Sequence, residues 1–121
     1  MNIHIKIGTA EKEFAEILVF YLYEDTKTVS APLAYCDKAL NNIVSELIKG
    51  KGFVAKLNKT IVLPTYGKIP AKRIMLVGLG KKKDITLDKI RQVAGITTST
   101  MRDIGASDGI SVMDSIDILL P

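Results

Sequence analysis

The sequence predicts a single α/β domain over residues 1–121, a three-layer α/β/α sandwich with helices on a mixed β-sheet. A length of 121 residues is typical of one domain with one core. Nearly continuous apolar runs at 16–23 and 73–79 are typical of strands that are covered on both faces. The segments 32–49 and 86–104 instead repeat apolar residues at three- and four-residue steps, which is typical of helices that bury one face.

The first part of the chain predicts two strands and a helix. Residues 2–7 alternate between polar and apolar side chains, which predicts a half-buried strand. The apolar run 16–23 follows as a buried strand. One continuous helix is expected over Pro32–Lys49, because Ser30 is a suitable N-cap and Gly50 a suitable end.

The middle of the chain predicts a hairpin and a further strand. The hairpin is expected to pair Phe53–Leu57 with Lys59–Thr65 and to turn at Asn58, a residue that can adopt the left-handed conformation. The strand Arg73–Leu79 follows as a nearly continuous apolar run. Together with the first two strands, these segments supply most of the predicted sheet.

The last part of the chain predicts a helix and an extended segment. The helix is expected over Thr86–Ile104 and ends at Gly105. Gly95 lies inside it and weakens it by about 1 kcal/mol relative to Ala, unless close packing requires a glycine there. Ile110–Leu120 is expected to close the chain as an extended segment that breaks near Asp114.

Charge makes nucleic acid one possible partner. The chain holds 17 Lys and Arg against 13 Asp and Glu, a formal net charge of +4, and its basic residues concentrate between Lys49 and Lys83. Arginine is the preferred side chain for phosphates and guanine edges, yet Arg73, Arg91 and Arg102 are the only arginines. A surface rich in lysine is also expected simply to solvate the fold.

The apolar pattern predicts a cytoplasmic protein without a membrane segment. The longest apolar run, Ile17–Tyr23, is far shorter than the roughly 20 residues that span a bilayer. The first residues alternate in polarity, so no signal peptide is expected. The single cysteine, Cys36, fits a reducing compartment, and its place on the apolar stripe of the first helix predicts a small buried hydrophobe.

No constellation of catalytic residues is found. His4 is the only histidine and lies on the polar face of the first predicted strand, which makes a Ser-His pair improbable. No serine lies in a Gly-x-Ser-x-Gly turn, and no His, Cys, Asp and Glu residues share the spacing of a metal site. We therefore predict no catalytic residue, no metal ligand and no cofactor for this chain.

One segment has the local geometry of an anion site. Gly78-Leu79-Gly80-Lys81-Lys82-Lys83 follows a buried strand and precedes the helix that starts near Thr86. Ligands collect at the carboxyl ends of strands in open α/β sheets, and free N–H groups at a helix start attract anions. The candidate ligand-binding residues are therefore Gly78, Gly80, Lys81, Lys82, Lys83 and Thr86. Alternatively, the glycines permit close packing and the lysines solvate the turn.

The segment Lys68–Lys81, in which an apolar run ends at Val77-Gly78-Leu79-Gly80, resembles the amino-terminal domain of the cytosol (leucyl) aminopeptidases. The helix start Thr86–Arg91 is similar to the family pattern Thr-x-x-x-(Leu/Ile)-Arg. Residues 53–65 resemble its Phe-x-Gly-Lys-x-Gly-x-x-x-x-Leu-Pro-Thr hairpin, although Ala55 and Asn58 replace the two glycines. The resemblance is collinear over essentially the whole chain.

The resemblance implies a macro-domain-like fold and a non-catalytic accessory role. Family members continue into a catalytic domain with two divalent metals, and no stretch here is similar to its Asn-Thr-Asp-Ala-Glu-Gly-Arg signature. The implied partners are that catalytic domain or further copies of the chain. Because macro-domain relatives bind ADP-ribose, an anionic nucleotide is an alternative ligand. The Gly-rich loop that they use is replaced here by Thr28–Pro32. Nucleic acid is the third hypothesis.

Overall fold

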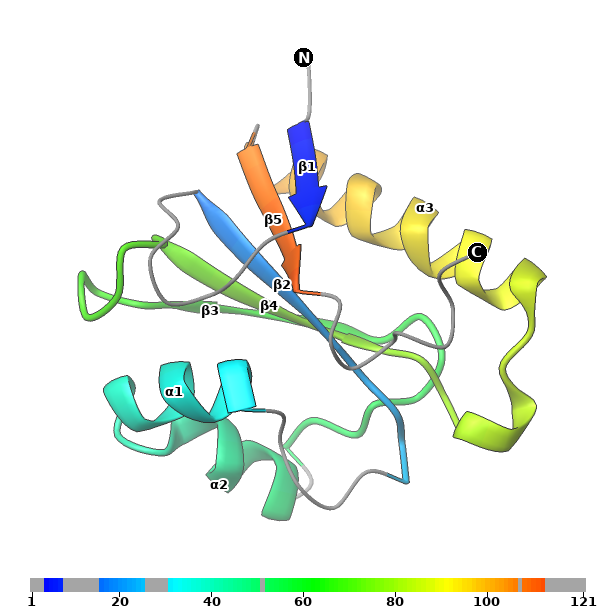
Figure 1. Cartoon of the computed structure of the whole chain (residues 1–121), viewed down its shortest axis with the longest axis horizontal. Helices are drawn as coiled ribbons and strands as arrows, with labels where there is room; N and C mark the ends of the chain where they lie inside the picture. Colours follow the sequence, from blue (N-terminus) through cyan, green and yellow to red (C-terminus); the bar gives the residue numbers. More distant parts are fainter. Residues whose placement is uncertain (1–3, 8–15, 26–30, 51, 107, 113–121) are drawn as a thin grey trace.

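A computed structural model describes residues 4–7, 16–25, 31–50, 52–106 and 108–112. In these residues, five strands form one sheet in the order β1-β5-β2-β4-β3 (Figure 1). Neighbouring strands are parallel, except that β3 runs antiparallel to β4, so the predicted mixed sheet is confirmed. The strands are β1 (His4–Ile7), β2 (Ile17–Leu22), β3 (Thr60–Pro64), β4 (Arg73–Gly78) and β5 (Asp108–Val112).

The adjacent strands β2 and β4 are buried on both faces. All six residues of β2 and the last five of β4 are buried. Because side chains alternate along a strand, Leu18, Phe20 and Leu22 enter one core and the residues between them enter another. We call these the first core and the second core. The apolar runs at 16–23 and 73–79 therefore carry the signal of two-sided burial, as predicted.

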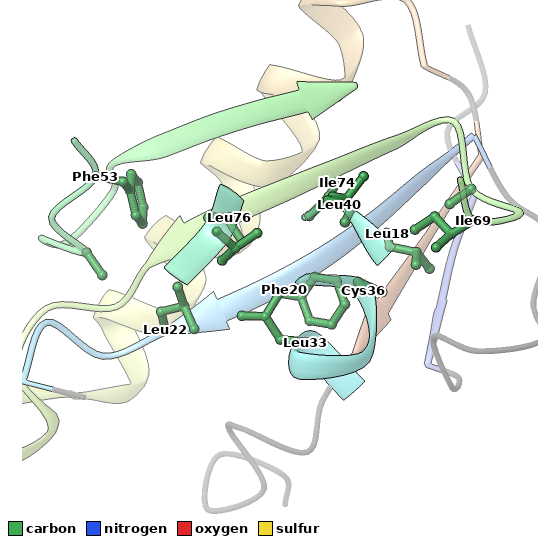
Figure 2. Close-up of a cluster of buried hydrophobic side chains, with 13 residues drawn as sticks. Leu18, Phe20, Leu22, Leu33, Cys36, Leu40, Phe53, Ile69, Ile74 and Leu76 are labelled. Atoms are coloured by element: carbon green, nitrogen blue, oxygen red, sulfur yellow. The ribbon is translucent and has the colours of Figure 1, made fainter. Parts of the chain in front are cut away.

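The first core lies under the helices α1 (Ala31–Ala39) and α2 (Ile43–Lys49). Leu33 and Cys36 of α1 are fully buried and pack in the same cluster as Phe20 of β2 (Figure 2). Burial of one such Leu or Phe side chain contributes about 1.5–3 kcal/mol. The expectation that Cys36 is a small buried hydrophobe is confirmed.

The prediction of one continuous helix over 32–49 is wrong, because the chain turns at Asn41 and Asn42. Both asparagines are left-handed, with φ of 60° and 64°, a conformation that ends a helix. Buried Asp37 of α1 then caps α2, since its carboxylate accepts hydrogen bonds from the Val44 N–H at 2.8 Å and the Ser45 N–H at 3.2 Å. The Ser45 hydroxyl donates to the other carboxylate oxygen.

The second core lies under the long helix α3 (Leu87–Asp103), on the opposite face of the sheet from α1 and α2 (Figure 1). The buried residues of α3 are Val93, Thr97 and Met101. Its start and end confirm the predicted span, with the Thr86 hydroxyl accepting from the Lys89 N–H at 3.2 Å as an N-cap. Helices on both faces of one sheet make the predicted three-layer sandwich.

The prediction of a hairpin within 53–65 is also wrong. The segment 53–57 is not a strand, and β3 instead pairs with β4 through a turn at Tyr66 and Gly67. Two local turns explain this, since the Lys56 N–H donates to the Val54 carbonyl and the Lys59 N–H to the Lys56 carbonyl. Asn58 does adopt the predicted left-handed conformation, with φ of 67°.

The remaining expectations concern the ends of the chain and the membrane. β5 begins two residues before the predicted segment 110–120, and the break near Asp114 lies outside the described residues. Among the helices described, none combines the length and apolar character that a bilayer crossing requires.

The Asp37 cap generates the first prediction. Asp37→Ala leaves the buried Val44 N–H without its acceptor and should lower the free energy of unfolding by about 2 kcal/mol in urea titrations. Ser45→Ala removes one hydroxyl bond and should cost less. Glu46→Ala changes an exposed residue of the same helix and serves as the control. An Asp37→Ala variant as stable as that control would contradict the capping role.

Gly95 generates the second prediction. A Cβ at this exposed position of α3 would meet no atom within 4 Å, so packing does not require a glycine there. Gly95→Ala should therefore raise the free energy of unfolding by about 0.5–1 kcal/mol. The neighbouring exposed Ala94 offers the inverse control, since Ala94→Gly should lower it by a similar amount. Destabilisation by Gly95→Ala would show that packing at this helix face does require a glycine.

Candidate functional site

The topology brings two loops together at one edge of the sheet. Because β2 and β4 are parallel neighbours, the segments that follow them leave the sheet at the same end. Two backbone hydrogen bonds join them there: the Leu79 N–H donates to the Leu22 carbonyl, and the Glu24 N–H donates to the Gly80 carbonyl, both at 2.8 Å. Glu24 therefore lies beside the glycine-containing loop that the sequence singles out.

A third segment closes against this edge. The Gly80 N–H donates to the Ala55 carbonyl at 3.1 Å, and the Gly78 N–H donates to the Lys59 carbonyl at 2.7 Å. The approach is close, since a Cβ on Gly78 would lie 2.1 Å from the Lys56 carbonyl oxygen. Residues 55–59 thus run directly over the end of β4, and Gly78 is required for that packing.

A surface hollow of about 260 Å³ opens where these segments meet. Its apolar part is formed by half-buried Leu57 and buried Leu79. Its charged part carries groups of both signs, three lysines and two carboxylates. The lining residues are Glu24, Lys56, Leu57, Leu79, Gly80, Lys81, Asp84 and Lys89.

The backbone of the glycine loop is already hydrogen-bonded. The N–H groups of Gly78, Leu79 and Gly80 all donate to backbone carbonyls, so they do not point freely at a ligand. The Lys82 N–H faces the Asp25 carboxylate at 3.4 Å. An anion at this place would therefore be held by lysine side chains rather than by a cradle of amides.

Only some of the predicted site residues reach the hollow. Gly80 and Lys81 line it, whereas Gly78 packs beneath residues 55–59 and Thr86 caps α3. Lys82 and Lys83 lie on the exposed 3₁₀ turn η1 (Lys82–Asp84), where the Lys82 ammonium is 5.9 Å from the centroid of the Tyr23 ring. The segment that sequence reasoning treated as one site is thus divided by the fold.

Sequence reasoning missed most of the charged lining. Glu24 could have been found, because it directly follows a strand parallel to β4. Lys56 could not, because the predicted hairpin would have placed its segment elsewhere. Asp84 and Lys89 are brought in by η1 and by the first turn of α3, and the Lys89 ammonium donates to the Asp84 carbonyl at 2.9 Å.

A metal centre is not indicated by the described part of the chain. In that part, no three His, Cys, Asp or Glu side chains come together in a way that could hold a metal ion. Glu24 and Asp84 are accompanied in the hollow by three lysines, which would oppose a cation. The hollow offers charged groups of both signs to a ligand.

Comparison with known proteins matches this chain to part of a larger enzyme. Its residues 17–119 match the model of the cytosol aminopeptidase family, N-terminal domain. Probable cytosol aminopeptidases of Alkaliphilus oremlandii and Sulfurihydrogenibium sp. are 35% and 34% identical to it over 106 and 108 residues. These matches cover 88% and 89% of this chain, but it spans only about a fifth of each relative, 21%.

Solved structures show the same fold. A tomato leucine aminopeptidase mutant matches with a TM-score of 0.68 and 18% identity, over 98% of this chain and 25% of that one. The macrodomain of Mycobacterium tuberculosis DarG matches with a TM-score of 0.66 and 14% identity, over 91% of this chain and 76% of that one. The macro-domain-like fold that the resemblance implies is confirmed. The chain belongs to the cytosol aminopeptidase family and corresponds to its N-terminal domain.

Proposed function

We propose that this chain is a non-catalytic accessory domain of a leucyl-type metallo-aminopeptidase. The observation that carries the proposal is the extent of the family match, which assigns residues 17–119 to the N-terminal domain alone. The relatives devote about four-fifths of their length to other sequence. The divalent metals and the peptide-cleaving residues would belong to that remainder, as the resemblance implies.

The proposed role is assembly. The domain would pack on a catalytic domain, in the same chain or a separate one, and would contribute to a homo-oligomer. Its location would be the cytoplasm, in keeping with relatives that are named cytosol aminopeptidases. A sheet covered by helices on both faces gives such a domain a rigid body of its own.

A peptidase assay tests the absence of catalysis. The purified 121-residue chain should release no p-nitroaniline from leucyl-p-nitroanilide above the buffer rate, with Mn²⁺ or Zn²⁺ present. The full-length Alkaliphilus oremlandii relative, assayed in parallel, is the positive control for metals and substrate. Metal-dependent hydrolysis that co-purifies with the chain through two orthogonal columns would contradict the proposal.

A second candidate function is binding of an anionic ligand at the hollow, which Gly80 and Lys81 line and which the other four predicted ligand-binding residues do not. The observation that favours it is the hollow, into which three lysines converge from separate segments. Since the loop amides are occupied, the ligand would depend on lysine side chains. Its anion could be the diphosphate of a nucleotide such as ADP-ribose. Lys81→Ala removes one of the three lysines and should weaken any binding that calorimetry detects with that nucleotide.

Nucleic acid stays a prediction drawn from charge. Residues 47–83 contain ten basic side chains and no acidic one, so the positive charge is concentrated in one part of the sequence. Contact with phosphates releases counterions, so such binding must weaken steeply as salt is raised. Retention on DNA that does not change with salt would contradict it.

A further inference from the structure

We propose that the hollow at the carboxyl ends of β2 and β4 binds a small zwitterion, an α-amino acid with an aliphatic side chain. The inference rests on the hollow being a ligand site, as in the second proposal above, and changes the class of ligand. It is independent of the accessory role. Three features of the hollow support the inference. Its lining carries both signs of charge, the main chain of its walls is hydrogen-bonded, and it is small with one apolar side.

The charges of the lining match a ligand that carries both signs. Lys56, Lys81 and Lys89 supply three positive charges, and Glu24 and Asp84 supply two negative ones, a net of +1. Within the described part of the chain, no ion pair joins these five side chains to one another or to other residues. A multiply charged phosphate would gain from the lysines and be repelled by both carboxylates. A zwitterion can face both groups favourably.

Backbone hydrogen bonds fix the main chain from which the charged side chains extend. The Glu24 N–H donates to the carbonyl of Gly80, the residue before Lys81. The Gly80 N–H donates in turn to the carbonyl of Ala55, the residue before Lys56. The Lys89 ammonium already donates to the Asp84 carbonyl. We therefore assign the ligand carboxylate to Lys56 and Lys81 and the ligand ammonium to Glu24 and Asp84.

The size and the apolar side of the hollow narrow the ligand further. A volume of about 260 Å³ lies below the range of about 300–1,000 Å³ that is typical of drug-sized and cofactor ligands. Leu57 and Leu79 supply apolar surface next to the charged groups. An aliphatic amino acid such as leucine meets all three requirements, since it is small, doubly charged and apolar at one end.

Leucine and two analogues, each lacking one of its charged groups, test the assignment directly. Amide NMR shifts of the full chain would be followed on addition of L-leucine, of isoamylamine (which lacks the carboxylate), of isocaproate (which lacks the ammonium) and of inorganic phosphate. We expect saturable shifts at Glu24, Gly80 and Lys81 with leucine, with a dissociation constant on the order of 1 mM. Isoamylamine and isocaproate should each bind at least about tenfold more weakly than leucine.

Two exposed or half-exposed charges offer matched variants. Glu24→Gln and Lys81→Met should each weaken leucine binding, whereas Lys68→Met in the β3–β4 turn, outside the hollow, should not. Two results would contradict the preference for a zwitterion and leave the anion proposal in place. One is equal affinity for isocaproate and leucine, and the other is phosphate binding that Glu24→Gln leaves unchanged. If no probe shifts these amides, both ligand proposals fail, while the accessory role is decided separately by the peptidase assay.

Discussion

Burial of both faces of β2 and β4 is the constraint on which the other elements depend. Two adjacent parallel strands with apolar side chains on each face need a helical layer above and below, because one layer would leave half of their side chains in water. α1 and α2 supply one layer and α3 the other. The parallel arrangement also sends both strands out at the same edge, and so the hollow follows from the same constraint.

The strands that are buried on both faces and the long third helix could be predicted from the sequence. The apolar run 16–23 and the helical apolar pattern of 86–104 are local signals, and both predict the observed elements. The helix break at Asn41 and Asn42 could not be predicted in this way, because the apolar stripe continues through it and the stabilising group is Asp37 on the preceding helix. Residues 53–57 have the composition of a strand, but composition cannot show that local turns and the end of β4 engage their backbone.

In the candidate site, too, a local sequence motif predicts some of the lining residues, and packing between distant segments brings in the others. A glycine loop after a buried strand indicates the edge of the sheet at which the hollow lies, and Gly80 and Lys81 line that hollow. Packing decided the rest. Gly78 accommodates residues 55–59, and Lys56 enters the hollow only because that segment crosses the end of β4. A domain that spans about a fifth of its relatives can thus still present a charged hollow of its own.

We expect this chain to fold as a unit, with β2 and β4 as its centre, without help from a second domain. Native-state hydrogen exchange of the isolated chain tests this most directly. Amides within β2 and β4 should exchange slowest, with an opening free energy equal to that of global unfolding in denaturant. Exchange of those amides at the rates of an unstructured chain would contradict it, since the double-sided core would then require another domain to form.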